Sequence, residues 1–244
     1  MPRFPVLACV SLVGVSGLAH ADRRSFTNTY EYSTVPEGKT ALELWSTQGR
    51  TTWDADSPQF YEQILEVEHG LTDHWDIAYY TVLAEGTGPG GAGEGLHLDE
   101  VRLESRYRFA DRGELPVDLL AYLELSKHFG ESVYGIEGKV IAAHDFDKLL
   151  VAANAISEIH VGRNVEEIEP ELAWAVGASY ELDPKLRFGV ETWGARDEGT
   201  TFSSVGPALS IAPGGDLWVA FTAGFGLTDA SDKFVARAII GIEL

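Results

Sequence analysis

The chain has 244 residues, with 18 Lys and Arg against 38 Asp and Glu, and a formal net charge of −20 at pH 7. This acidic balance argues against a nucleic-acid partner, because proteins that bind nucleic acids carry basic stripes. Hydrophobic residues make up 45% of the sequence, which is too many for a disordered chain. Beyond the N-terminal region no stretch has about 18 consecutive apolar residues, so a helical membrane protein is excluded.

Residues 1–21 have the pattern of a secretory signal peptide. Arg3 supplies a positive charge, residues 4–18 are mostly apolar, and Ala19-His20-Ala21 fits the small-residue cleavage site. The stretch that ends at Cys9 loosely resembles a lipoprotein cleavage box, but cleavage there would leave almost no apolar region. We therefore expect cleavage after Ala21, which removes the only cysteine and leaves the mature chain without disulfides.

Residues 22–39 form a separate N-terminal region, in which residues 26–33 have a β-like pattern. An arm in the periplasm, a plug inside a barrel, and an extra strand are the three alternatives for this region. We favour the arm.

From residue 40 to residue 244 apolar and polar residues alternate in nearly every segment, which is the pattern of half-buried strands. A soluble sandwich or a lipocalin also has such strands. However, the segments run for about 9 to 13 residues, enough to cross a bilayer at a tilt, whereas strands of soluble proteins average about 5 to 6. The pattern therefore predicts an all-β fold, an antiparallel transmembrane β-barrel of residues 40–244 in the cell outer membrane, in contact with its lipid.

The predicted connections alternate between two kinds, which is typical of outer-membrane barrels. Short connections, rich in turn residues, are expected at residues 70–74, 110–116, 146–147, 183–184 and 213–216. Generally longer or more irregular connections are expected near residues 48–59, 85–97, 128–134, 161–169, 195–201 and 228–232. The count gives about twelve strands in up-and-down order, with both chain ends on the periplasmic side.

Three successive segments carry a resemblance to a known family: Glu66-Val67-Glu68-His69-Gly70-Leu71-Thr72-Asp73-His74-Trp75-Asp76, then Leu103-Glu104-Ser105-Arg106-Tyr107-Arg108-Phe109, then Leu115-Pro116-Val117-Asp118-Leu119-Leu120-Ala121-Tyr122-Leu123-Glu124. Over residues 40–160 the chain resembles the barrel family named for the MetA pathway of phenol degradation. The resemblance implies an outer-membrane transporter of small hydrophobic or aromatic compounds. Such barrels often end in an aromatic residue that the barrel-assembly machinery reads, whereas this chain ends in Leu244.

Charged side chains fix the phase of each strand, because an Arg or Lys facing the middle of the lipid costs roughly 2 to 4 kcal/mol. They are therefore expected to face the lumen. The candidates for a lumen constriction are Glu100, Arg102, Glu104, Arg106, Arg108, Glu124, Glu137, Lys139, Glu171, Glu191 and Arg237. They predict either a charged permeation path that sorts solutes by size and sign or a filling of salt bridges that closes a small barrel.

No motif predicts a cofactor, a metal site or catalysis. Residues 86–91 match G-x-G-x-x-G, but no helix follows to hold a phosphate. The histidines lack metal-binding spacing. Residues 144–147 are expected to form a solvated turn rather than a weak cation site. Asp54 and Asp56 in an outer loop leave two alternatives, a calcium site or no ligand. Ser126 and His128 lie on one face with Glu124, yet no nucleophile elbow is present, so an enzyme is not expected.

Most tryptophans lie toward predicted strand ends, where aromatic girdles meet the membrane interfaces. Trp45, Trp193 and Trp218 are predicted to face the lumen and offer an alternative, a platform for sugars or aromatic compounds. The sequence thus predicts a channel or transporter for a small-molecule solute. The alternative is a structural or adhesion barrel with a closed, salt-bridged lumen that acts through its outer loops.

Overall fold

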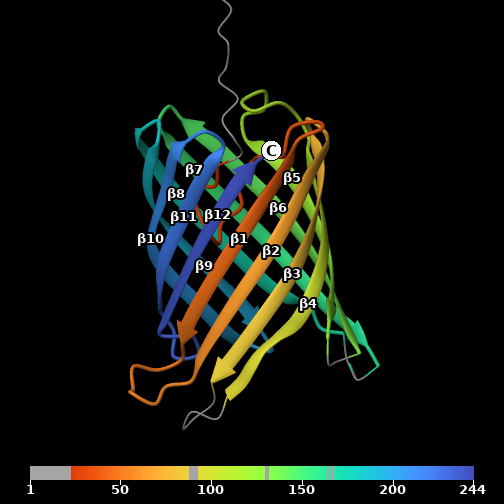
Figure 1. Cartoon of the computed structure of the whole chain (residues 1–244), viewed down its shortest axis with the longest axis vertical. Coiled ribbons are helices and arrows are strands. Elements are labelled where there is room, and N and C mark those ends of the chain that lie inside the picture. The colour runs from red at the N-terminus through yellow and green to blue at the C-terminus, as the bar shows by residue number, and fades with distance from the viewer. Residues whose placement is uncertain (1–22, 88–92, 130–131, 164, 166–167) are drawn as a thin grey trace, which may run out of the picture.

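The computed structural model describes residues 23–87, 93–129, 132–163, 165 and 168–244. The predicted signal peptide with Cys9, and most of the glycine-rich loop at 86–91, lie outside these residues. Twelve antiparallel strands close into one barrel, in which β1 pairs with both β2 and β12 (Figure 1). The all-β fold, the up-and-down order and the strand count of twelve are confirmed. Within the described residues no helix is long and apolar enough to cross a membrane.

The strands are longer than those of an average soluble sheet. They are β1 (Thr40–Arg50), β2 (Gln59–Thr72), β3 (Trp75–Thr87), β4 (Gly93–Arg108), β5 (Asp118–His128), β6 (Val133–Phe146), β7 (Leu149–Gly162), β8 (Glu171–Asp183), β9 (Leu186–Asp197), β10 (Thr200–Gly214), β11 (Leu217–Gly226) and β12 (Phe234–Glu243).

The two ends of the barrel differ. At the end where β1 begins and β12 ends, here called the terminal end, four of the five connections are two residues long and only 109–117 is longer. The opposite end, here called the loop end, carries the other connections. One of these was expected to be long and is not: β9 and β10 are joined by Glu198 and Gly199 alone, both with positive φ (43° and 83°), as a tight hairpin requires.

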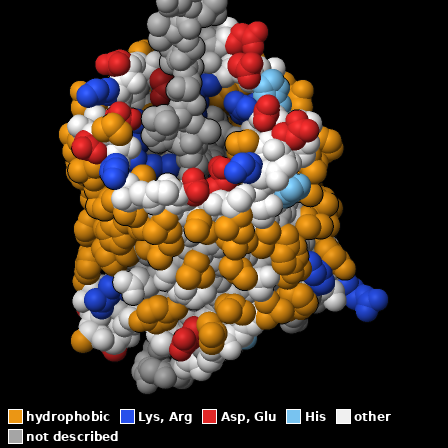
Figure 2. Space-filling view, turned by 45° about the horizontal axis from the view of Figure 1, so that its top comes forward, with side chains coloured by type: hydrophobic (Ala, Val, Ile, Leu, Met, Phe, Trp, Pro, Cys, Tyr) orange, Lys and Arg blue, Asp and Glu red, His pale blue; other side chains and the backbone are white. Residues whose placement is uncertain are grey.

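The alternation in the sequence becomes an outer and an inner face. On β4 the side chain of Leu103 is 59% exposed, whereas its neighbour Glu104 is 3% exposed and faces the lumen. Figure 2 shows the outward residues as a broad hydrophobic band around the wall, with charged side chains gathered at the rim. This is the surface that a lipid bilayer requires.

Residues 23–38, here called the inner segment, lie inside the barrel at the terminal end (Figure 1). Phe26, Tyr32 and Val35 are fully buried there. Phe26 fills the space that Gly177 leaves on β8, where a Cβ atom would lie 2.6 Å from the ring. The only strand-like pairing of the segment is a single parallel bridge between Glu37 and Gly70, so residues 26–33 add no strand to the barrel.

Candidate functional site

Glu191, on the lumen face of β9, holds the inner segment by its carboxylate. It accepts hydrogen bonds from the backbone N–H groups of Thr27 (3.1 Å), Asn28 (2.9 Å) and Thr29 (2.9 Å). The side chains of the same three residues donate to it at 3.1 Å each, and Thr222 on β11 donates as well. Glu191 is 1% exposed, so the three consecutive N–H groups provide the solvation that a buried carboxylate needs.

The inner segment is also bound to other walls of the barrel. Asn154 on β7 pairs with the backbone of Tyr30 in both directions, at 2.7 and 2.9 Å. The N–H of Val35 donates to Asp76 on β3 at 2.8 Å. Since β3 and β9 are six strands apart in a ring of twelve, the segment spans the lumen from wall to wall.

Arg24 lies on the side of the segment that faces β1. Its guanidinium is 3.3 Å from the carboxylate of Glu43 and packs over the rings of Tyr30 (4.3 Å) and Trp45 (4.6 Å). Burial alone would lower the pKa of Arg24, but the carboxylate of Glu43 raises it well above its ordinary value. Arg24 is therefore a permanent positive charge inside the barrel.

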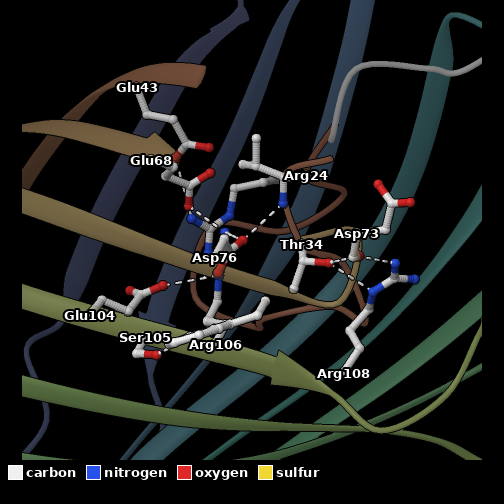
Figure 3. Close-up of polar contacts among 12 residues, drawn as sticks. Arg24, Thr34, Glu43, Glu68, Asp73, Asp76, Glu104, Ser105, Arg106 and Arg108 are labelled. Carbon is white, nitrogen blue, oxygen red and sulfur yellow. Dashed lines mark hydrogen bonds and ion pairs between the residues drawn. The ribbon is translucent and has the colours of Figure 1, made fainter. Parts of the chain in front are cut away.

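Arg106 on β4 is the centre of a second buried group, here called the deep cluster, with Glu68, Asp76 and Glu104. Its Nη2 atom is 2.7 Å from both Glu68 and Asp76, and its Nε atom is 3.0 Å from Glu104. Figure 3 shows the four side chains pointing toward one another from three neighbouring strands. Each of the four is less than 5% exposed. Because a buried charge is tolerated only when it is paired and hydrogen-bonded, this cluster locks the strands that carry it.

A third group lies closer to the loop end. Lys139 on β6 is 3.0 Å from Glu137, and its ammonium stands 4.0 Å from the ring centres of Tyr30 and Tyr122. On β4, Arg102 contacts Glu100 and approaches Glu124 to 3.8 Å. The cations of this group thus lie between carboxylates and aromatic faces.

The strand register places five glutamates directly beside one another across five strands, in an acidic row. The pairs are Glu104–Glu124, Glu124–Glu137, Glu137–Glu158 and Glu158–Glu171. Like charges directly opposite one another destabilise a sheet, which explains why Arg106, Arg102 and Lys139 contact this row.

A cavity of about 570 Å³, here called the outer cavity, occupies the lumen on the loop side of the inner segment. Thr27, Asn28 and Tyr30 of the segment form part of its lining, and residues 230–232 of the β11–β12 connection lie at its other end. The wall includes aromatic and charged side chains: Trp45, Arg102, Tyr122, Glu137, Lys139, Glu171, Trp193 and Arg237. Its volume is within the range of small-molecule sites in proteins.

The residues predicted for a constriction do not form a single ring. Arg106 and Glu104 belong to the deep cluster; Arg102, Glu137, Lys139, Glu171 and Arg237 line the outer cavity; Glu100 and Glu124 contact Arg102; Glu191 and Arg108 bind the inner segment. Arg108 lies at the terminal end of β4 and donates to Thr34 at 2.8 Å (Figure 3). Of the three tryptophans of the predicted platform, Trp45 and Trp193 line the outer cavity, whereas Trp218 is packed over Gly241.

Several residues of the site were not among the predicted ones. Arg24, Glu43 and Asp76 were missed, as was Asn154. Glu43 and Asp76 could have been found, because each is an acidic residue at an inward position of an alternating strand. The position of Arg24 could not, because the alternation carries no information about where a segment without strands lies.

No family model and no curated protein matches the sequence. Solved structures do match the fold. The KdgM porin in complex with disordered oligogalacturonate aligns with 83% of this chain and 97% of its own, with 9% identity and a TM-score of 0.58. The NanC porin aligns with 83% of this chain and 100% of its own, at 10% identity and a TM-score of 0.59.

A third similar structure is the β domain of the Bordetella autotransporter BrkA. It covers 84% of this chain and 98% of its own, with 10% identity and a TM-score of 0.53. Porins and an autotransporter domain thus share this architecture at identities too low to indicate a common activity. The chain has the fold of an outer-membrane β-barrel.

Proposed function

We propose that this chain is an outer-membrane channel or transporter for small solutes, and that the outer cavity is where the solute first binds. The observation that supports this most directly is the cavity itself. It lies inside the barrel, is lined by convergent polar and aromatic groups, and has the volume of a small-molecule site. A barrel that served only as a membrane anchor has no need of such a cavity.

The lining gives a first idea of the solute. The resemblance to the MetA-pathway family implies small hydrophobic or aromatic compounds, and Trp45 and Trp193 provide aromatic surface. However, the ring of Trp45 already carries Arg24 and Arg237, and those of Tyr30 and Tyr122 carry Lys139. We therefore favour an aromatic or apolar body that also has polar groups to engage the charged lining.

The inner segment stands between the outer cavity and the terminal end. In the transport cycle that we propose, the segment shifts to let the solute pass, because its contacts reach opposite walls of the lumen. Apart from the backbone that continues through Lys39 into β1, the segment is held by hydrogen bonds and an ion pair. Its displacement is therefore a local opening with a finite free-energy cost.

Conductance of the purified barrel in planar bilayers tests the proposal. A channel gives discrete current steps, and Arg102→Gln or Glu137→Gln in the outer cavity changes their size or ion selectivity. Lys185→Gln, in an exposed turn at the terminal end, is the matched control and leaves both unchanged.

Uptake of aromatic solutes into proteoliposomes is the second measurement, because a transporter can work without a steady current. A folded barrel that neither conducts nor accelerates uptake of any solute tested contradicts the proposal. That result favours the alternative of a structural or adhesion barrel, with the deep cluster and the inner segment as its permanent filling.

A further inference from the structure

Three buried glutamates face one another in the lumen beside the deep cluster. Glu43 on β1 and Glu66 on β2 are direct cross-strand neighbours, and Glu68 follows two residues further along β2 on the same face. The three are 3%, 0% and 2% exposed. One carboxylate oxygen from each lies within 4.8 Å of one from each of the others. Carboxylates in this arrangement repel one another strongly unless something positive stands between them.

The cations near this group neutralise two of its members and leave the third. Arg24 is 3.3 Å from Glu43, and Arg106 is 2.7 Å from Glu68. For Glu66, no N–H, hydroxyl or ammonium group of the described residues donates to either carboxylate oxygen, and its side chain, although fully buried, has only the neighbouring carboxyl of Glu68 within hydrogen-bond reach among these residues. A buried acceptor pair without such a donor is rare in folded proteins and points to a missing ligand.

The local charge count points the same way. Five buried carboxylates, those of Glu43, Glu66, Glu68, Asp76 and Glu104, face two guanidiniums, those of Arg24 and Arg106. Five negative charges against two positive ones leave three in excess. In a poorly solvated interior such an excess is too costly to persist.

We propose that Glu43, Glu66 and Glu68 bind a divalent cation of the calcium type. Calcium is bound by carboxylate oxygens at about 2.3 to 2.6 Å, so two ligands on opposite sides of the ion stand roughly 4.6 to 5.2 Å apart. One oxygen from each of the three carboxylates lies within 4.8 Å of the others, which is close enough for all three to reach a single ion. The ion joins β1 to β2, and through Glu43 it also supports the contact to Arg24 of the inner segment.

The site carries its own optical reporter. The indole N–H of Trp45 donates to a carboxylate oxygen of Glu43 at 2.8 Å. Tb³⁺ replaces Ca²⁺ in oxygen-ligand sites, and its luminescence is excited through a nearby tryptophan. The full mature barrel in detergent, excited in its tryptophan band, is therefore expected to sensitise added Tb³⁺, and Ca²⁺ is expected to displace the signal.

Substitutions test whether the ion binds at these three glutamates. Glu66→Gln keeps the shape of the side chain but removes its charge, and we expect at least a tenfold loss of Tb³⁺ affinity. Glu158→Gln makes the same change elsewhere in the lumen and leaves the affinity unchanged. Trp45→Phe abolishes the sensitised signal but retains calcium binding, measured with radioactive calcium by equilibrium dialysis. The heat-modifiable mobility of each barrel on gels shows that it is folded, and Glu43→Gln replaces Glu66→Gln if the latter fails to fold.

The proposal is overturned if the folded wild-type barrel binds neither Tb³⁺ nor Ca²⁺. It is equally overturned if Glu66→Gln binds both ions as the wild type does. In either case the excess charge is removed by protons shared among the three carboxyl groups. The measurement does not depend on conductance, so it stands or fails separately from the proposed transport.

Discussion

Replacing Glu191 by Gln is expected to loosen the inner segment without unfolding the barrel. The carboxylate receives six hydrogen bonds from residues 27–29, three of them from consecutive backbone N–H groups. Glutamine keeps one acceptor oxygen, loses the negative charge, and turns an NH₂ group toward donors that have no use for it. The wall is affected less, because Thr222 is the only one of the described barrel residues that donates to this carboxylate.

The size of the effect follows from the hydrogen bonds that change. A hydrogen bond to a charged group contributes about 1.5 to 3 kcal/mol, against roughly 1 kcal/mol for a neutral one. A carboxylate has about four acceptor positions, so the six bonds cannot all reach full strength. We estimate that the free energy of releasing the inner segment falls by about 2 to 4 kcal/mol. This corresponds to a rise of roughly 30- to 700-fold in the fraction of molecules with the segment released.

Hydrogen exchange followed by mass spectrometry measures the change in the released fraction directly, because the amides of residues 27–29 exchange only when the segment is released. The wild type and Glu191→Gln are compared in the same detergent, with residues 217–226 of the wall as the internal reference. Glu158→Gln is the matched control, since it removes a lumen carboxylate that has no described contact with the segment. If the two variants speed exchange at residues 27–29 equally, or neither does, the anchoring role of Glu191 is refuted.

Three further substitutions test other parts of the structure. Arg106→Met leaves the carboxylates of the deep cluster without their shared cation. We expect the free energy of unfolding, measured in urea by tryptophan fluorescence, to fall by about 3 to 5 kcal/mol. Gly70→Ala places a Cβ atom 2.0 Å from a carbonyl oxygen of the inner segment, so we expect faster proteolysis of residues 35–38. Leu103→Arg puts a charge in the hydrophobic band and is expected to cost roughly 2 to 4 kcal/mol, measured by unfolding from lipid vesicles.

Each of these three predictions has a control or a result that would contradict it. Lys39→Gln is the control for Arg106→Met, because it removes an exposed ion pair to Glu243 that contributes at most about 1 kcal/mol to the free energy of unfolding. If Arg106→Met lowers the free energy of unfolding by no more than Lys39→Gln does, the deep cluster is not specially stabilising. Gly95→Ala adds a Cβ atom to open space, and should leave proteolysis as it is. A Leu103→Arg barrel that is as stable in vesicles as the wild type would mean that this face does not meet lipid.

The wall of the barrel could be predicted because every strand follows one rule. A residue such as Leu103 must face lipid and its neighbour Glu104 must not, so a single charged residue sets the phase of a whole strand. The lengths of the connections then set the count at twelve. The tight hairpin at Glu198 and Gly199 was not predicted. Its two central residues adopt positive φ, and a glycine after a glutamate is a weak turn signal.

The interior could be predicted only in part, because it depends on register and on a segment without regular structure. The acidic row needs the exact pairing of five strands, and a slip of two residues in any of them would break it while leaving the alternation intact. The anchoring of residues 27–29 on Glu191 joins positions about 160 residues apart in the sequence. Neither relation leaves a local trace in the sequence.

The position of the inner segment sets a condition on the proposed transport. Asn28 and Tyr30 contribute to the lining of the outer cavity and are also bound to Glu191 and Asn154. A solute in the cavity therefore touches the same residues whose release would open the lumen. It can shift the segment only by as much as it prefers the released form over the seated one. A solute that displaces Tyr30 from Lys139 and Tyr122 gains that preference, because it takes over their cation–π and edge contacts. A solute that binds only to the wall has no such preference and leaves the balance between the seated and released forms unchanged.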